Sequence, residues 1–517
     1  MLARLLTQLF GRQRMAPSRA APAADLPATT PVDIGRGALD AGDFSSAAAQ
    51  LQEPLDGQPG SADLRWKMAH AQTGLGDIGA AIALISPILT APQAQPGKLR
   101  LLDAAVKALA RFSTQSEADR KECAALLGCV LLEQGEFDAA FRCAAIIAND
   151  PDRRLTYHAL RFGDDLLADC RAAGLPAVVS ETLFSTSTRG DRYPAYLCTL
   201  PGGMVLGHSA IPMSADKVVY LARQVHNPTA YFKQTLAWRQ DMLCLATANH
   251  LVVAEAGVDE YPGTHVLIGH KANPGHWMLN HFGRLRVLED LPVPPDAKLL
   301  LPDNIGALAL RSLELAGFPA ERLTLVPNGR IARCDRLLVP SMLYGGLHGL
   351  LYWTDEVPHF IRRMLTPTPA KVRPRRILVT RKGAQWRHLR NEAEVLGALA
   401  DLGFESVELG SLDLDQQIAL AAESSAIVGA FGAGMSIVLL AHPGTAVIEI
   451  KANLHGVMDI HPKVAAALGV TYAGVIATAI RTSPEPSDLL NADLVCDPAA
   501  VRATVIEALR IATAIGQ

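Results

Sequence analysis

The chain has 517 residues, of which 19% are charged, and its formal net charge at pH 7 is −3. This length predicts several domains with large cores. The near-neutral charge excludes a protein whose surface as a whole binds nucleic acid. The eight cysteines show no C-x-x-C spacing, which argues against a disulfide framework or a zinc site and favours a reduced, cytoplasmic protein.

Residues 1–32 form a basic N-terminus followed by an Ala/Pro-rich linker. The first fourteen residues combine Leu2, Leu5 and Leu9 with arginines and contain no acidic residue. As an amphipathic helix this stretch would make weak peripheral contact with the inner face of a membrane, and a disordered terminus is the alternative. No run of about eighteen apolar residues is present, so the sequence predicts no membrane-spanning helix.

Residues 33–150 are rich in alanine and predict an all-α region. A Gly-acid-apolar pattern occurs at Gly42, Gly76 and Gly135, at spacings of 34 (76 minus 42) and 59 (135 minus 76). The first spacing is the period of tetratricopeptide repeats, and the pattern would open the second helix of each hairpin. We predict tetratricopeptide-like repeats, which either pack against the rest of the chain or dock a protein partner.

Residues 151–365 and 366–517 alternate strands with helices and predict two αβ lobes. In the first lobe, the strands are expected at 177–184, 265–269, 298–302, 323–327 and 335–340, with a helix at 305–317. In the second, strands are expected at 375–380, 404–409, 426–428 and 446–450, with helices at 391–403, 414–424 and 435–441. This alternation favours an α/β fold of mainly parallel, doubly wound sheets, with ligands at the strand C-termini that face the cleft.

The stretch "GAFGAG" lies between a strand and a helix of the second lobe. Gly429, Gly432 and Gly434 leave the backbone N–H groups at the start of the helix accessible, which favours a phosphate. Glu449, expected at the C-terminal end of the next strand, would accept hydrogen bonds from ribose hydroxyls. The sequence therefore predicts a nucleotide-binding site.

Three segments in order resemble the family 61 glycosyltransferases, which include bacterial capsular-polysaccharide biosynthesis proteins. The segments are "PGHWMLNHFGRL", "VTRKGAQWRHLRNEAEV" and "GAFGAGMSIVLLAHPGTAVIEI". The resemblance implies a GT-B-like pair of Rossmann-type lobes, a nucleotide-sugar donor, a glycan or glycoconjugate acceptor, inversion at the anomeric carbon and no cofactor or required metal. With the glycine-loop argument, we assign binding of the donor nucleotide to Gly429, Gly432, Ala433, Gly434, Ser436, Lys382 and Glu449.

Catalysis without a metal needs fixed cations to neutralise the departing diphosphate, and Arg381, Lys382 and Arg387 follow the first strand of the second lobe. Inversion also needs a base that takes the proton of the acceptor hydroxyl, for which we select His276, with Trp277 stacking on a sugar. Other candidates for the base are Asp303, His281 and His270. The remaining motif residues, expected to position substrate, are Arg284, Asn391 and Glu392, and capping of a helix is the alternative for Asn391.

Two positions of the glycine loop depart from the family pattern. Phe431 stands where the family usually has a histidine, and Ile437 where an asparagine often follows. Because Phe431 cannot donate a hydrogen bond, a weakly active or inactive glycan-binding scaffold is one alternative. An NAD-dependent oxidoreductase is the other, although the glycine order is G-x-x-G-x-G and not G-x-G-x-x-G. The favoured function is transfer of a hexosyl or pentosyl group in surface polysaccharide synthesis.

Overall fold

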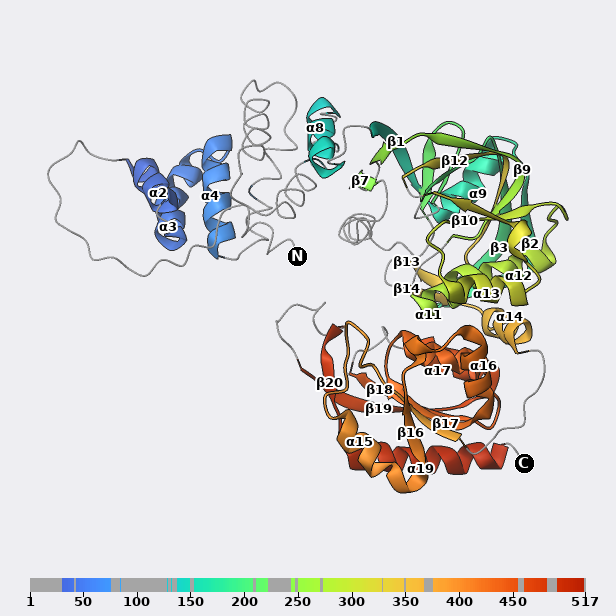
Figure 1. The fold of residues 1–517 in the computed structure, drawn as a ribbon. Coiled ribbons are helices and arrows are strands. Elements are labelled where there is room, and N and C mark those ends of the chain that lie inside the picture. The colour runs from blue at the N-terminus through green and yellow to red at the C-terminus, as the bar shows by residue number, and fades with distance from the viewer. Residues whose placement is uncertain are drawn as a thin grey trace. The chain divides into compact units, whose positions relative to one another are not determined.

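A computed structural model gives the fold of the chain (Figure 1). It describes residues 30–40, 43–75, 84, 128, 132, 137–148, 153–207, 211–221, 243–246, 250–269, 273–327, 329–347, 350–366, 375–453, 460–480 and 491–515. No helix within these ranges is long and apolar enough to cross a membrane. The chain divides into two compact units, residues 1–159 with 228–256 and residues 160–227 with 257–517.

The first unit begins with helices. They are α2 (Pro31–Asp40), α3 (Phe44–Gly57), α4 (Ala62–Leu75) and α8 (Phe137–Ala148). Two of them, α3 and α8, begin at the apolar position of the first and third copies of the Gly-acid-apolar pattern, as predicted, and Asp43 caps α3 by accepting from the Ser46 backbone N–H at 3.1 Å. The second copy and residues 1–14 lie outside the described residues. The tetratricopeptide assignment stays a prediction.

Strands complete the first unit. β8 (His250–Glu255) pairs antiparallel with β7 (Leu243–Ala246) and with β1 (Arg154–Phe162). Helix α8 packs its Cys143 and Ala144 against Leu245 and Val252 of these strands. This small core is separate from the core that α2, α3 and α4 form with one another.

The second unit begins with a mixed sheet. Its strands are β2 (Ala177–Ser187), β3 (Arg192–Pro201), β4 (Met204–Leu206), β5 (Ile211–Met213), β6 (Val218–Leu221), β9 (Val258–Leu267), β10 (Lys298–Pro302), β11 (Leu323–Val326), β12 (Ile331–Pro340), β13 (Gly345–Leu347) and β14 (Leu350–Trp353). Its helices are α9 (Gly163–Ala172), α11 (Pro274–His276), the π-helix η1 (Trp277–His281), the 3-10 helices η2 (Phe282–Arg284) and η3 (Ala320–Arg322), α12 (Leu285–Asp290), α13 (Ala307–Leu315) and α14 (Glu356–Leu365).

The prediction of a mainly parallel sheet in this region is wrong. Only β9, β10, β11 and β12 pair in parallel, whereas β2, β3, β4, β5, β13 and β14 pair antiparallel with their neighbours. The cause is the length of the connections, because a parallel pair needs a crossover of roughly a dozen residues or more. Helices link β9 to β10 and β10 to β11, but short turns such as 188–191 join the antiparallel strands.

A separate parallel sheet follows, as predicted. Its strands are β15 (Arg375–Val379), β16 (Phe404–Val407), β17 (Ser424–Ala430), β18 (Ala446–Ala452), β19 (Thr471–Ile480) and β20 (Asp493–Val495), in the spatial order β16-β15-β17-β18-β19-β20. All neighbours are parallel except β20, which is antiparallel to β19. Its helices are α15 (Glu392–Ala398), the 3-10 helices η4 (Ala400–Leu402), η5 (Leu409–Ser411) and η6 (Ala433–Leu440), α16 (Leu414–Glu423), α17 (Ile460–Leu468) and α19 (Pro498–Ile515).

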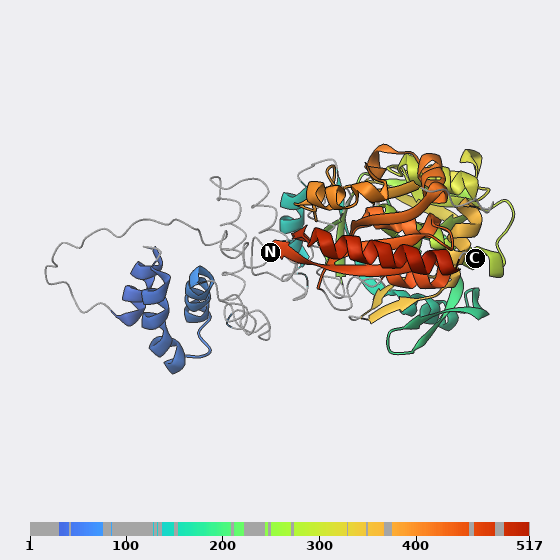
Figure 2. The same cartoon turned by 90° about the horizontal axis from the view of Figure 1, so that it is seen from below.

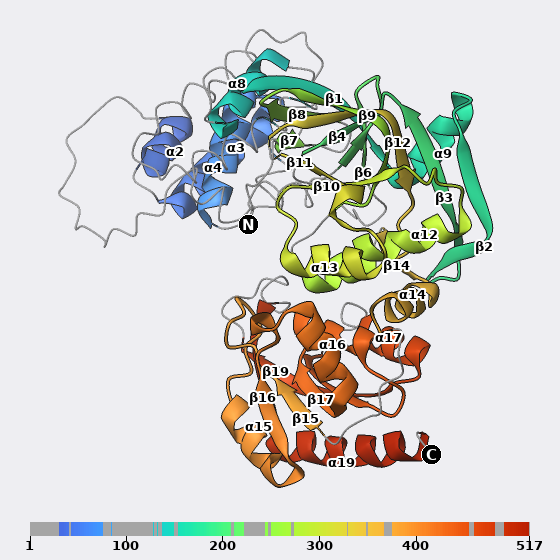
Figure 3. The ribbon, with the colours of Figure 1, turned by 45° about the vertical axis from the view of Figure 1, so that its right-hand side comes forward.

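Helices cover both faces of the parallel sheet. Alternate residues of each strand enter different cores: Ile377 and Val379 of β15 pack with α16, α17 and η6, whereas Leu378 packs with α15 and α19. Figure 2 shows the long helix α19 lying across one face of the sheet, and Figure 3 shows α16 and α17 on the opposite face. Burial on both faces explains why the strands are almost continuously apolar.

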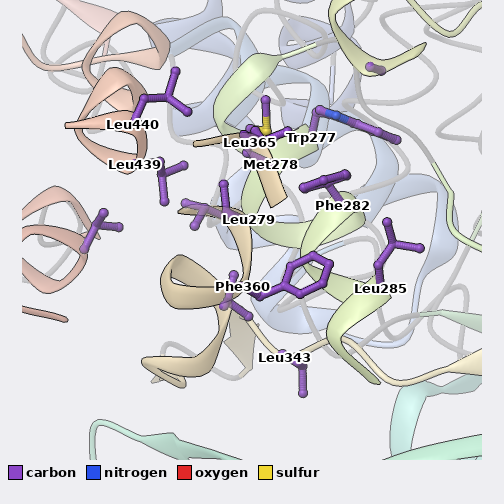
Figure 4. Packing of buried hydrophobic residues seen from close by; sticks show 14 of the residues in the cluster. Trp277, Met278, Leu279, Phe282, Leu285, Leu343, Phe360, Leu365, Leu439 and Leu440 are labelled. Carbon is purple, nitrogen blue, oxygen red and sulfur yellow. The ribbon is translucent and has the colours of Figure 1, made fainter. Parts of the chain in front are cut away.

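One apolar core joins the mixed sheet to the parallel sheet. Met278 and Leu279 of η1 belong to the same buried cluster as Leu439 and Leu440 of η6, with Phe360 of α14 nearby (Figure 4). The segment that contains the His-Trp motif is thereby fixed next to the helix that follows the glycine loop. The pair of Rossmann-type lobes predicted from the sequence is thus one parallel sheet and one mixed sheet with a shared core.

Candidate active site

The strand order of the parallel sheet reverses at one point, between β15 and β17. From β15 the chain passes to β16 on one side, and it then returns to β17 on the other side of β15. In such sheets ligands bind beyond the carboxyl ends of the two strands that flank the reversal. A cavity of about 260 Å³ lies there; its lining includes Thr380 and Arg381 after β15, Ala433 and Gly434 after β17, and Pro274, Met278 and Leu308 from the mixed-sheet region.

The glycine loop lies at this cavity. A Cβ on Gly429 would be 2.7 Å from Met435 Sδ, and a Cβ on Gly432 would overlap the Arg381 guanidinium. Gly432 therefore leaves room for an arginine from the neighbouring strand end. The residues after it form a 3-10 helix, of which Ala433, Gly434 and Ser436 line the cavity.

Arg381 and Arg387 form a pair of like charges beside this loop. Burial, together with repulsion from Arg387, lowers the pKa of Arg381 to about 10. Burial also lowers the pKa of Arg387, which attraction to Glu449 partly opposes. Arg381 donates to the Trp386 carbonyl from Nε at 3.0 Å and from Nη2 at 2.8 Å. Within the described residues neither arginine has an ion-pair partner closer than 4 Å.

Arg387 has a poorly hydrogen-bonded side chain and a strained backbone conformation. Its buried Nε has no hydrogen-bond partner in the described structure, and its Nη1 reaches the Phe431 carbonyl only at 3.5 Å. Its backbone lies in the left-handed region with φ 61°, which costs roughly 1–3 kcal/mol for a non-glycine residue. Such strain gathers at functional sites. An anionic ligand would stabilise two partly desolvated guanidinium groups that have no carboxylate in ion-pair contact.

His276 ends α11 and is oriented by a residue one turn further on. Its Nδ1 lies 2.8 Å from Asn280 Oδ1, and Asn280 Nδ2 donates to the Tyr344 carbonyl at 2.9 Å, which fixes the amide. Because Oδ1 only accepts, the neutral imidazole has its proton on Nδ1 and its basic lone pair on Nε2. A base whose tautomer is set by a neighbouring side chain is the arrangement found in catalytic histidines.

The structure brings the His276 segment to the glycine-loop helix. A Cβ on Gly275 would lie 2.6 Å from Ser436 Oγ, so the two backbones pass close to each other. The turn after His276 is a π-helix, a local irregularity that is frequent at functional sites. The histidine and the loop come from segments about 150 residues apart in the chain, and the shared core places them together.

Residues 275–448 match the model of the family Glycosyltransferase 61. No curated protein matches the chain. The Glycosyltransferase 61 segment begins one residue before His276, includes both arginines and the glycine loop, and ends one residue before Glu449. The match supports glycosyltransferase activity, with a sugar donor and a glycan acceptor.

Three other predicted residues of the Glycosyltransferase 61 segment, Lys382, Asn391 and Glu392, lie between β15 and the first turn of α15. Glu392 accepts from Thr380 Oγ1 at 2.9 Å, next to the cavity. Asn391 precedes α15 but does not cap it with its side chain, because it donates to the Cys496 carbonyl at 2.8 Å. Lys382 is exposed and is not among the residues lining the cavity.

Glu449 lies in a different place from the one predicted. It occupies the middle of β18 and not its end, and its side chain is completely buried. Its Oε1 is 2.5 Å from His461 Nδ1, and its Oε2 accepts from Tyr472 at 2.8 Å. With both oxygens engaged and no place in the cavity lining, Glu449 anchors the interior of the sheet and attracts Arg387.

Three predicted site residues of the His-Trp segment are buried in the core. Trp277 is only 1% exposed, donates to Ser312 Oγ at 2.9 Å and stacks on His281, so it offers no face to a sugar. Arg284 is buried, which lowers its pKa to about 10, and it donates to the Ile268 carbonyl at 3.0 Å. His281 is also buried.

The other residues singled out in the sequence have the following places. Asp303 lies on the surface after β10, and His270 is outside the described residues. The Phe431 ring lies 5.0 Å from the Arg387 guanidinium carbon and 5.5 Å from the His461 ring. Ile437 is buried and contributes to the cavity lining.

Sequence reasoning missed two site residues, Asn280 and Glu408. Asn280 follows His276 by four residues, the spacing of one helical turn, but the π-helix that aligns them has no sequence signal. Glu408 lines the cavity directly after β16. An acid at the C-terminal end of a predicted strand was the signal that could have identified it.

Proposed function

We propose that the protein is an inverting, metal-independent glycosyltransferase that moves a hexosyl or pentosyl group from a nucleotide-sugar donor to a glycan or glycoconjugate acceptor. The observation that carries the proposal is the arginine pair Arg381–Arg387. Both guanidinium groups are half-buried and have no ion-pair partner within the described residues. Arg381 lines the cavity where the strand order of the parallel sheet reverses, and Arg387 lies beside the glycine loop at Phe431. A nucleoside diphosphate provides the compensating charge.

The reaction is a single displacement. The acceptor hydroxyl oxygen bonds to the anomeric carbon while the bond from that carbon to the diphosphate oxygen breaks, and the leaving group retains the electron pair. His276 takes the acceptor proton on Nε2, with Asn280 holding the ring. Arg381 and Arg387 stabilise the charge that develops on the diphosphate, the task that a metal ion performs elsewhere.

The wider setting of the proposal rests on the sequence. We place the protein in surface or capsular polysaccharide synthesis in the cytoplasm, with the helical region 33–150 as a docking site for a protein partner. Peripheral contact with the inner membrane face through residues 1–14 belongs to the same proposal.

A thermal-shift screen tests the function. The purified full-length chain, with EDTA present, is heated with UDP, GDP, CMP, ADP, their sugar conjugates and NAD. A nucleotide at about 100 times its dissociation constant stabilises the fold by roughly 2.7 kcal/mol, which raises the melting temperature by a few degrees. Stabilisation by one nucleoside diphosphate, lost in Arg381→Met, supports the transferase. Stabilisation by NAD alone supports the oxidoreductase.

A glycan-binding scaffold is the second candidate, and Phe431 is the observation that favours it. The aromatic ring stands beside Arg387 where a hydrogen-bond donor is usual in the family that the sequence resembles. The scaffold predicts glycan binding without stabilisation by any nucleotide and without release of nucleoside diphosphate.

A further inference from the structure

We propose that Glu408 accepts hydrogen bonds from the ribose hydroxyls of the donor nucleotide. The inference rests on the proposed function, since it assigns the nucleoside half of the same cavity. It replaces the assignment of this role to Glu449.

The strand order places Glu408 at the required edge. It is the first residue after β16, which pairs in parallel with β15 so that Val379 lies opposite Val407. The Thr380 backbone N–H donates to the Val407 carbonyl at 3.0 Å, which holds the two strand ends together. Glu408 therefore lies at the same edge of the sheet as Arg381. In parallel nucleotide-binding sheets, an acid at the end of the second strand accepts from ribose.

The Glu408 carboxylate lies directly against the loop that follows β15. A Cβ on Gly383 would overlap Glu408 Oε1, so the carboxylate lies in contact with the backbone of this loop. Both residues line the cavity, as does Arg381 two residues before Gly383. A nucleotide whose diphosphate contacts Arg381 would have its ribose within a few ångströms of this carboxylate.

Other carboxylates around the parallel sheet are already engaged. Glu449 bonds to two partners in the interior, Glu392 accepts from Thr380, and Glu405 and Glu423 pair with Arg375. Across the described ranges, the Glu408 carboxylate has no hydrogen-bond or ion-pair partner. It is an exposed acceptor at a cavity wall, which a ribose diol would satisfy with two hydroxyl donors.

The cavity continues beyond Glu408 with features suited to a nucleobase. Leu409 and Leu414 are buried apolar residues of its lining, and Leu308 faces it from α13. Gln417 Nε2 donates to the carbonyls of Leu409 and Leu412 at 3.1 Å each, so its Oε1 is the atom with accepting capacity. An acceptor of this kind suits a base edge with an N–H donor.

Calorimetric titration of the full-length protein tests the inference. The probes are UDP, GDP and ADP, each with its 2′-deoxy counterpart. We expect the wild type to bind the ribonucleotide that it selects about 10-fold or more tightly than the deoxy form, the effect of one hydrogen bond to a charged group. Glu408→Ala should lose this preference, and its affinity for the deoxy form should fall by less than its affinity for the ribonucleotide, because the deoxy form makes only one of the two hydroxyl contacts.

Two control variants separate the possible outcomes. Glu405→Ala removes an exposed acid of the same strand, and Glu449→Gln alters the rival acceptor without changing its shape; both should keep the ribose preference. A preference that persists in Glu408→Ala overturns the inference, as does a wild type that binds ribo and deoxy forms equally. A wild type that binds none of the six nucleotides overturns the proposed function and the inference with it.

Discussion

The arginine pair gives the sharpest prediction: Arg387→Met should weaken nucleotide binding without destabilising the ligand-free protein. The methionine keeps the apolar stem, while the lost guanidinium has an unpartnered Nε and one long hydrogen bond. A pKa of Arg381 near 10, compared with an ordinary value above 12, corresponds to roughly 3 kcal/mol of cost for its charged form. Burial is the larger cause of this pKa shift, and repulsion from Arg387 is the smaller one. Because solvent also screens the partly exposed Arg381 side chain, removing Arg387 should relieve the folded protein of about 1 kcal/mol or less of repulsion.

The loss on the ligand side should be larger. A charge-assisted hydrogen bond to a phosphate is worth roughly 1.5–3 kcal/mol, which corresponds to about 10- to 150-fold in affinity. The assay is thermal unfolding with and without the nucleoside diphosphate, followed by calorimetric titration. Arg390→Met is the matched control, because that arginine is exposed in the same loop and pairs with Asp493. A melting temperature several degrees lower with unchanged affinity would refute the reasoning and make Arg387 a structural residue.

Further variants test the other residues. Trp277→Ala should destabilise the fold by about 3–5 kcal/mol in urea unfolding because the ring is buried, whereas a sugar-stacking role predicts lost activity at unchanged stability. Asn280→Ala should lower kcat by about 10-fold and shift the pH dependence of kcat, whereas His276→Ala should lower kcat by roughly 10²- to 10⁴-fold. If Asn280→Ala and the wild type have the same pH dependence, Asn280 has no part in the mechanism. Gly432→Ala should displace the arginine beside it and weaken nucleotide binding; unchanged calorimetric affinity would contradict this. Burial and the nearby Arg362 lower the pKa of His442 in the folded protein, so as the pH falls the unfolded chain binds a proton at this histidine before the folded chain does. Stability should therefore be intact above about pH 6.5 and should fall below it. This fall should be smaller in His442→Gln when melting temperatures are compared across pH.

The sequence by itself determined the local elements of the parallel sheet. The strands at 375–379 and 446–452, the glycine elbow after Gly429 and the helix that follows it all appear where apolar runs and glycines predicted them. These features are local, because strand propensity and glycine's missing Cβ act over a few residues. The Arg-rich loop after β15 was found in the same way.

Only the tertiary structure decided which of the predicted residues meet. Whether Glu449 and Trp277 are buried or exposed could not be predicted from their motif positions, and tertiary packing places both in the interior. Glu408 reaches the cavity because β16 pairs with β15, and Asn280 reaches His276 because a π-helix aligns them. Strand pairing and helix register depend on contacts between distant segments, so residue type and spacing along the chain did not contain them.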